Sequence, residues 1–335
     1  AMRVLNITNG DGAANIIKQS SVSGDVLAWR DPMHHGPFPA GLSLTELAKV
    51  RARYLAGPEG DVSAVERDFA LRDQHLGAAQ GYDRVVLWFE HDLLDQLQIL
   101  QILDWFAAAR LEGPDLQMIC IGSFPGKPGF RGIGELTPAD AATLVAHQKA
   151  VTAPMLALAV AGWAAFRSDN PEDLVAFLGG DLSELPFLEA ALRRHLQEYP
   201  DAATGVTRTE AQLLRLVGEG VHGARGLFTR NMDLETALYI GDWGTYRILD
   251  KLCAAGLATC DPGPFRYPSF AHDAPDYFDA QRLSLTDMGR KALEADQHAF
   301  GVMPRDEWLG GVELATKAGV WTWDKTAARV LRRAI

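Results

Sequence analysis

Leu87-Trp88-Phe89-Glu90-His91-Asp92 is the stretch of sequence that decides the fold. The apolar run over residues 84–89 predicts a buried strand, and the apolar-faced stretch over residues 93–106 predicts a helix. Three ionisable side chains, those of Glu90, His91 and Asp92, stand between the two elements. Open parallel sheets bind ligands in the loops at the carboxyl ends of their strands. The sequence therefore predicts a functional site at these three residues.

The rest of the first 125 residues repeats this alternation. Strands are predicted over residues 4–8, 26–29, 84–89 and 116–121, and helices over residues 13–19, 44–55, 62–76 and 93–106. The pattern predicts an α/β fold with an open Rossmann-like parallel sheet and helices on both faces. The long connection between the second and third strands lets the chain cross the sheet, which predicts the strand order 2-1-3-4. That order brings the loops after residues 8 and 89 together.

The overall composition is that of an ordinary globular protein. The chain has 335 residues, of which 47% are hydrophobic and 22% charged, and this length favours two or three domains. The formal net charge of -11 argues against non-specific binding to nucleic acid phosphates or anionic lipid, while local basic patches stay compatible with it. The cysteines form no C-x-x-C pair, so we expect neither a disulfide framework nor a zinc ribbon.

The N-terminal and apolar segments indicate a cytoplasmic protein. Residues 3–7 form a strand-like run without the basic and apolar regions of a signal peptide. The most apolar stretch, residues 151–166, contains Pro154 and Gly162 and is shorter than the roughly 20 residues of a membrane span. We therefore expect a core helix there and no membrane partner.

The loop after the first strand, Asn9-Gly10-Asp11-Gly12, is a candidate ligand-binding loop. Its glycines let backbone N–H groups approach a phosphate, and the dipole of the following helix favours an anion. The loop lacks both the G-x-G-x-x-G fingerprint and the lysine of a P-loop, and Asp11 repels a phosphate unless a cation or proton intervenes. The alternative is a tight turn in which Asp11 caps the helix.

The loop after the second strand carries Arg30, Asp31, His34 and His35. Arg30 can clamp an anionic ligand with two hydrogen bonds, and either histidine can transfer protons near neutral pH or bind a metal. Because adjacent histidine side chains tend to diverge, we expect at most one of them to reach a given ligand. The alternative is a surface ion pair of Arg30 with Asp31 beside exposed histidines.

The loop after residue 89 has a structural alternative for one of its three residues. Asp92 can cap the following helix, with Asp95 favourable in the first turn. Glu90 needs a partner such as Arg30 or a cation, because an unpaired charge after a buried strand is costly. Asp11, Glu90 and Asp92 could together hold a divalent metal, but their spacing matches no specific metal signature. The sequence leaves both metal and cofactor open.

The three loops share a pattern with one bacterial family. The pattern consists of Asn9-Gly10-Asp11, of Trp29-Arg30-Asp31-Pro32 followed by His35-Gly36-Pro37, and of Trp88-Phe89-Glu90-His91-Asp92-Leu93 with Gln96-Leu97. It resembles the bacterial domain of unknown function 1835 over about the first 125 residues. The resemblance implies membership of that family but no activity, because the family is itself functionally uncharacterised.

Residues 126–200 are predicted to form a helical linker subdomain. Helix-start chemistry occurs at residues 137–140, 171–173 and 185–187. Apolar residues recur at helical spacing between residues 188 and 196, so Arg193-Arg194-His195 is predicted to be a solvated helix face rather than a site.

Residues 201–335 show a third pattern. A capping box at residues 207–210 predicts the start of a helix over residues 211–217. The elements predicted after it are a helix over 244–255, strands over 256–259 and 282–286, and a helix over 287–295. This order resembles a winged helix-turn-helix. Residues 205–298 contain ten Arg and Lys against thirteen Asp and Glu, and the candidate recognition segment offers only Arg247 and Lys251. We therefore favour packing over nucleic acid binding for this part.

The C-terminal stretch concentrates three of the eight tryptophans, Trp308, Trp321 and Trp323. Aromatic side chains at this density are usually buried or at an interface. We favour packing across the domain junction, with stacking on a base or another ligand as the alternative.

We expect a cytoplasmic enzyme or ligand-responsive protein that binds a small polar or phosphorylated molecule at the sheet edge. His91 or His35 would act as general base, Glu90 or Asp11 would orient it or hold a cation, and Arg30 would bind the anion. The candidate catalytic residues are Glu90, His91 and His35, and the candidate ligand-binding residues are Asn9, Asp11, Arg30, Asp31, His34 and Asp92. Hydrolysis or group transfer is the reaction class. The alternatives are a ligand-sensing transcriptional regulator that binds DNA and a non-catalytic interaction scaffold; the sequence does not indicate an oligomeric state.

Overall fold

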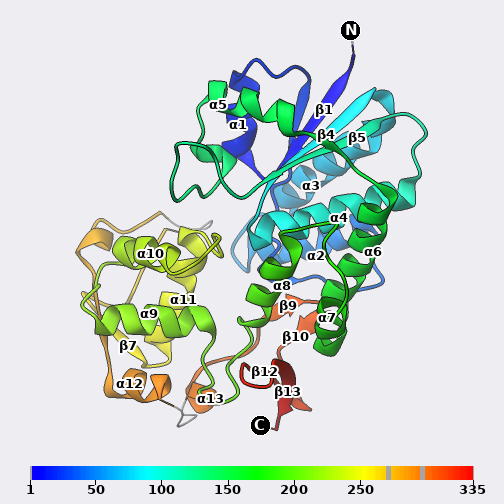
Figure 1. The fold of residues 1–335 in the computed structure, drawn as a ribbon. Coiled ribbons are helices and arrows are strands. Elements are labelled where there is room, and N and C mark those ends of the chain that lie inside the picture. Colours follow the sequence, from blue (N-terminus) through cyan, green and yellow to red (C-terminus); the bar gives the residue numbers. More distant parts are fainter. Residues whose placement is uncertain (1, 269–272, 295–298, 335) are drawn as a thin grey trace. The chain divides into compact units, whose positions relative to one another are not determined.

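The computed structural model describes residues 2–268, 273–294 and 299–334, and the chain forms two compact units (Figure 1). The first unit comprises Ala1–Gly57, Asp61–Leu192 and Gly310–Val312, and the second comprises Pro58–Gly60, Arg193–Leu309 and Glu313–Ile335. The division therefore falls at residues 192/193, and the segment after residue 125 packs with the α/β part. None of the described helices combines the length and apolarity needed to cross a membrane.

The first unit is built on a five-stranded sheet. Its strands are β1 (Val4–Thr8), β2 (Asp25–Ala28), β4 (Arg84–Glu90), β5 (Asp115–Ile121) and β6 (Lys149–Ala150), in the order β2-β1-β4-β5-β6. The first four are parallel, and β6 adds to β5 in antiparallel orientation. The predicted order 2-1-3-4 is confirmed, because the third and fourth predicted strands are β4 and β5. The sequence did not predict β6, which has only two residues.

Helices cover both faces of this sheet (Figure 1). The helices along this part of the chain are α1 (Asp11–Gln19), α2 (Leu44–Ala56), α3 (Val62–Gly77), α4 (Leu93–Ala109), α5 (Pro138–Thr143), α6 (Ala153–Arg167), α7 (Pro171–Leu178) and α8 (Leu188–Leu196), with short 3-10 helices at Ala78–Gly81, Ile133–Glu135 and Leu144–His147. The α6 helix packs on α4 and α7 packs on α6, while α8 runs across the division at residues 192/193. Ala13 and Ile17 of α1 pack on Val86 and Trp88 of β4. The expected core helix is α6, and the close approach of Gly162 to Leu100 packs it against α4. This packing explains why residues 126–192 belong to the first compact unit.

Two glycines near the C-terminus extend the first unit. The strand β3 (Gly36–Pro37) lies in a small sheet with β9 (Trp308–Gly310) and β10 (Val312–Glu313). The amide of Phe38 donates to the carbonyl of Gly310 (2.8 Å), and the amide of Gly311 donates to the carbonyl of Phe166 (3.0 Å). A Cβ on Gly310 would lie 2.4 Å from the Phe166 carbonyl oxygen, so only glycine permits this approach.

The second unit contains helices and two antiparallel sheets. Its helices are α9 (Arg208–Gly218), α10 (Ala224–Asp233), α11 (Asp242–Ala254), α12 (Asp287–Leu293) and α13 (Ala299–Val302), with a 3-10 turn at Phe278–Ala280. The strands are β7 (Ala258–Asp261) paired with β8 (Arg282–Leu285), and β11 (Ala315–Thr316), β12 (Gly319–Asp324) and β13 (Arg329–Arg333) in one sheet. The predicted capping box of α9 is present at Thr207 and Glu210. The sequence did not predict α10, and the last residue of the helix predicted over 287–295 lies outside the described residues.

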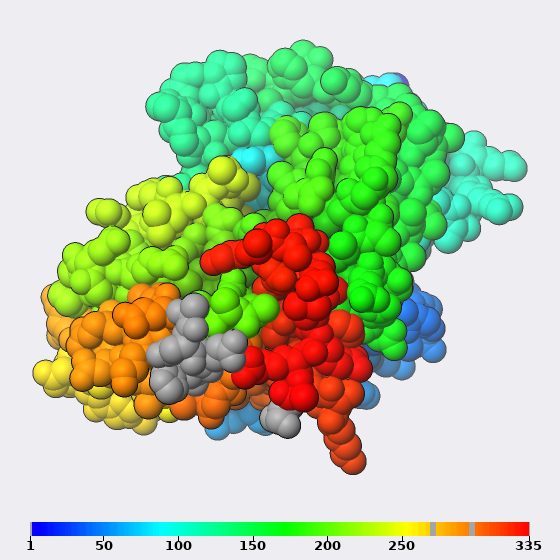
Figure 2. All heavy atoms as spheres, turned by 60° about the horizontal axis from the view of Figure 1, so that its bottom comes forward, coloured from blue at the N-terminus to red at the C-terminus, as the bar shows by residue number. Residues whose placement is uncertain are grey.

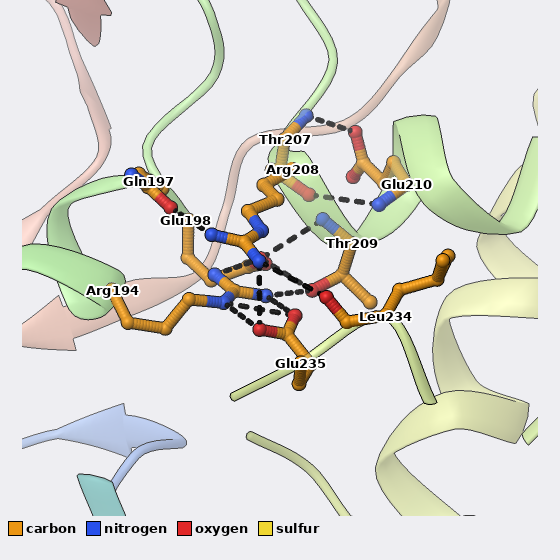
Figure 3. Close-up of polar contacts among 9 residues, drawn as sticks. All are labelled: Arg194, Gln197, Glu198, Thr207, Arg208, Thr209, Glu210, Leu234 and Glu235. Atoms are coloured by element: carbon orange, nitrogen blue, oxygen red, sulfur yellow. Dashed lines mark hydrogen bonds and ion pairs between the residues drawn. The ribbon is translucent and has the colours of Figure 1, made fainter. Parts of the chain in front are cut away.

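One sequence interpretation in this region is wrong. Arg193-Arg194-His195 was predicted to be a solvated face, but Arg194 is almost buried and His195 is 1% exposed. Arg194 forms ion pairs with Glu198 (3.0 Å) and Glu235 (2.8 Å), as Figure 3 shows. Only Arg193 is exposed. Glu235, 41 residues further along the chain, supplies the negative charge that compensates the burial of Arg194. Helical spacing alone cannot reveal this pairing.

Candidate functional site

The carboxyl ends of β1 and β4 lie side by side. Thr8 of β1 pairs with Trp88 of β4 and donates its hydroxyl to the Trp88 carbonyl (2.8 Å). One residue further, the side-chain amide of Asn9 donates to Oε2 of Glu90 (3.0 Å). The expected meeting of the loops after these two strands is confirmed.

Three buried carboxyl groups converge at this edge. Glu90 ends β4, Asp92 is the N-cap of α4, and Asp95 lies in the first turn of that helix. One oxygen from each of the three lies within 4.8 Å of the others, and the residues are between 0% and 4% exposed. We call Glu90, Asp92 and Asp95 the acidic cluster.

Neutral amide groups supply the hydrogen bonds of the acidic cluster. The Asn9 amide donates to both oxygens of Asp95 (3.0 and 3.1 Å) and to Glu90 (3.0 Å). The backbone N–H of Ile133 donates to Oε1 of Glu90 (2.5 Å), the N–H of Glu90 to Asp95 (2.6 Å), and the N–H of Asp95 to Asp92 (2.9 Å). Across the described parts of the chain, no Lys or Arg forms an ion pair with these carboxyl groups. Their charge is therefore not balanced by a cationic side chain.

Burial without a cation makes ionisation of the cluster difficult. Burial raises the pKa of Glu90 to about 8, and the neighbouring Asp92 carboxyl adds to the rise. Burial also raises the pKa of Asp92 to about 6, against the lowering effect of the N–H groups of Asp95 and Leu94. The pKa of Asp95 lies well above its ordinary value because of burial first and then the charges of Asp92 and Glu90. All three carboxyl groups can be ionised together only if a cation is bound. Without a cation, at least one of them keeps a proton.

The donor set fits a hard divalent cation. Carboxylate oxygens are the preferred ligands of Mg²⁺, Mn²⁺ and Ca²⁺. A half-turn of the Asn9 amide would present its oxygen, a further ligand of the same kind, to the cluster. Cys120 lies nearby, but burial raises the pKa of its thiol to about 12, which makes it a poor nucleophile. The third carboxylate of the cluster is Asp95 rather than Asp11, the residue that the sequence suggested.

Asp11 and Arg30 form a separate pair on the surface. Nε of Arg30 donates to both carboxylate oxygens of Asp11 (2.8 and 2.9 Å), and the side chains of Arg30 and Asp11 are 58% and 62% exposed. Arg30 is therefore not the partner of Glu90. Asp11 is the first residue of α1, two residues after Asn9, whereas Arg30 lies in the loop after β2.

Asp31 is buried away from solvent. It binds Arg51 of α2 through Nη2 (2.7 Å) and Nε (3.1 and 3.2 Å), and the side chains of Asp31 and Arg51 are 0% and 1% exposed. Nη1 of Arg51 donates to the carbonyl of His35 (2.6 Å). The surface pair of Arg30 with Asp31 considered from the sequence does not form, because each residue has another partner. Asp31 holds the loop that carries the two histidines.

The histidines occupy two places. The His34 and His35 rings have centroids 4.1 Å apart, so the expected divergence is wrong; the turn closed by the His35 N–H and the Pro32 carbonyl (3.0 Å) brings them together. His34 is buried and His35 half-buried. The half-buried His91 packs edge-on against Phe187, with centroids 6.0 Å apart. The structure brings Asn9, Glu90 and Asp92 together and adds Asp95.

Comparison of the chain with protein-family models and with curated proteins finds no match. The arguments for function therefore come from the geometry and chemistry of the site.

The predicted DNA-reading helix offers little positive charge. Nζ of Lys251 pairs with Glu307 (2.8 Å), and the Arg247 guanidinium lies over the Trp243 ring, 4.8 Å from its centroid. One of the two predicted cations is thus neutralised by a carboxylate.

Proposed function

We propose that the first unit binds a divalent cation through Glu90, Asp92 and Asp95 and uses it to hold a small polar, phosphorylated ligand at the carboxyl edge of the sheet. The observation that carries this proposal is the convergence of three buried carboxyl groups with no Lys or Arg partner in the described chain. Burying such charges without compensation is costly. A bound cation would remove that cost. It would also lie at the carboxyl edge of the sheet, where open parallel sheets bind their ligands.

Protons and a cation compete for the same oxygens. In the metal-free protein the raised pKa of Glu90 favours a proton on the cluster near neutral pH. A cation would displace it, because metal ligands must be deprotonated. If the cluster served only the fold, neutral replacements of its carboxyl groups would raise the stability of the protein and change no metal response. If the cluster is a cation site, the same replacements would abolish the stabilisation by metal.

Hydrolysis or group transfer is the reaction class that suits this edge. A bound cation would polarise a phosphoryl oxygen and lower the pKa of bound water. Arg30 is more than half exposed, and a surface pair such as that with Asp11 is worth only about 0–1 kcal/mol. Arg30 can therefore exchange Asp11 for an anionic ligand at little cost. His91 and His35 are our candidates for proton transfer.

A metal titration tests the cation site. Protein freed of metal with EDTA is melted with increasing MgCl₂, MnCl₂ or CaCl₂, and the wild type should be stabilised by about 2.7 kcal/mol at a hundredfold excess over Kd. Glu90→Gln and Asp95→Asn should lose this response, and the matched control Asp11→Asn, at the same edge, should keep it. The proposal fails if the wild type shows no response, or if both cluster variants respond as the wild type does.

We also propose that the chain belongs to the domain of unknown function 1835 family, on its three loop motifs. The order α9, α10, α11, β7, β8 and α12 supports a winged-helix-like module, again as a proposal. The pairing of Lys251 with Glu307 weakens the case for DNA binding by it.

A further inference from the structure

The second unit contains a pocket of about 330 Å³ that the function proposed above does not use. It is lined by the segment before α9, by α9 itself, by Leu293 of α12 and by Trp323 and Lys325 at the end of β12. Every lining residue belongs to the second unit. The volume lies in the range of about 300–1,000 Å³ typical of small-molecule sites.

One wall of the pocket is aromatic and held in place. The amide of Trp323 donates to the Pro200 carbonyl (2.9 Å), and the amide of Ala202 donates to the Trp323 carbonyl (2.9 Å). These bonds join β12 to the segment before α9. The C-terminal strands are the red region of Figure 2. The half-buried Trp323 is joined by the apolar Val206 and Leu293. This wall offers a flat surface for a ring.

The pocket is cationic in an acidic protein. Its charged lining comprises Arg208, Arg215 and Lys325 against the single carboxylate of Asp201, while the chain carries a net charge of -11. Lys325 is 72% exposed and lies 3.6 Å from Asp201. The exposed Arg215 forms no ion pair within the described residues. The excess of positive charge favours a ligand with more than one negative charge.

An ionic network fixes Arg208, one of the residues that line the pocket (Figure 3). Its Nη2 pairs with Glu235 (2.9 Å) and its Nη1 donates to Gln197 (2.5 Å). Arg194 balances the second carboxylate of the network, Glu198 (3.0 Å). Arg208 is therefore largely neutralised. Arg215 remains without a carboxylate partner among the described residues, and an exposed pair such as that of Lys325 with Asp201 (3.6 Å) is weak, so Lys325 can turn to an anionic ligand at little cost.

The amino end of α9 does not explain the pocket. The N–H of Arg208 donates to the Gln197 carbonyl (3.0 Å), that of Thr209 to Glu198 (3.0 Å), and that of Glu210 to the Thr207 hydroxyl (3.2 Å). These groups are already satisfied by the protein. An anion would instead be held by side chains.

We propose that this pocket binds a nucleoside monophosphate, with its base stacked on Trp323 and its phosphate held by Arg215 and Lys325. An indole ring and two cations among the lining residues match the two ends of such a ligand, because bases stack on indole rings and guanidinium groups bind phosphate with two hydrogen bonds. A simple aromatic carboxylate carries one charge and would leave one of the two cations unmatched. Gln197 and Thr204 provide polar groups for the base or sugar.

Isothermal titration calorimetry with AMP, GMP, CMP and UMP tests the proposal on the full chain. At least one nucleotide should bind saturably, and the corresponding nucleoside and inorganic phosphate should each bind more weakly than that nucleotide. Arg215→Gln and Trp323→Leu should each weaken binding about tenfold or more, given the strength of charge-assisted hydrogen bonds and of base stacking. Arg215→Lys and Trp323→Phe should keep most of the affinity.

One control separates this site from other effects. Arg230→Gln removes an exposed arginine of α10 outside the pocket and should not change nucleotide affinity. Circular dichroism checks the fold of each variant, and Trp323→Phe with the Arg215 variants keeps the test valid if Trp323→Leu does not fold. The proposal is overturned if no nucleotide binds, if phosphate binds as tightly as the tightest-binding nucleotide, or if Arg215→Gln or a folded Trp323→Leu leaves affinity unchanged.

Discussion

Replacing Asp31 with asparagine should lower the free energy of unfolding of the first unit far more than is usual for a loop residue. The change keeps the shape of the side chain and removes its charge, which leaves Arg51 as an uncompensated cation in a site where it is 1% exposed. Removing one partner of a buried ion pair costs about 3–5 kcal/mol. Against a total stability of roughly 5–15 kcal/mol for a typical protein, this is a large fraction.

The geometry around Arg51 refines that magnitude. Its guanidinium makes three contacts with Asp31 of 2.7–3.2 Å, donates to the His35 carbonyl (2.6 Å), and lies 4.1 Å from the centroid of the Phe38 ring. The asparagine side chain would retain one acceptor oxygen, so we expect a loss near the lower end of that range, about 3 kcal/mol. A double change of Asp31→Leu with Arg51→Met should cost less than the sum of the single changes, because it removes both charges together.

Urea unfolding of each variant, followed by circular dichroism, gives the free energies. Asp11→Asn is the matched control, since it breaks the exposed pair with Arg30 and should cost no more than about 0.5 kcal/mol. A loss below about 1 kcal/mol for Asp31→Asn would refute the reasoning, as would strictly additive costs in the double variant. Either result would make Asp31 a ligand-binding candidate again.

Two further predictions concern the second unit. Burial, and then the charge of Arg194, lowers the pKa of His195 to about 4, so below pH 6.5 only the unfolded state takes up the proton and stability falls as the pH drops. Urea unfolding at pH 7 and pH 5 should show about 2 kcal/mol of this loss in the wild type and its absence in His195→Phe; an equal loss in both would contradict the assignment. In fluorescence anisotropy, the chain should show no salt-sensitive binding of duplex DNA, and binding that disappears in Arg247→Ala or Lys251→Ala would contradict our preference for packing.

The sequence predicted those parts of the fold that depend on local pattern. The strand ending at Glu90, the cap at Asp92 and the capping box at Thr207 each follow from neighbouring residues, and connection lengths were enough for the strand order. The α10 helix was missed because Gly226 interrupts a weak helical pattern. Local signals thus carried most of the architecture of the first unit.

The site itself depends on contacts between distant residues. Asp95 has a sufficient local explanation as an acidic residue in a first helical turn, and only the approach of Asn9 and Ile133 shows that it belongs to a cluster. The partner of Asp31 lies 20 residues further along the chain. Neither pairing leaves a signal in the spacing of residues, so sequence reasoning placed Asp11 and Arg30 where the structure has Asp95 and Arg51.

The return of Gly310–Val312 to the first unit has a consequence for biosynthesis. As the chain leaves the ribosome, the α/β unit has its whole parallel sheet after residue 121, yet the carbonyl that accepts the Phe38 amide arrives only with Gly310. Until then the edge at β3 stays unfinished while the second unit is being made. A fragment that ends at Leu192 would lack Gly310–Val312, and the Phe38 amide would have no carbonyl partner there. The two units are therefore best expressed and studied as one polypeptide.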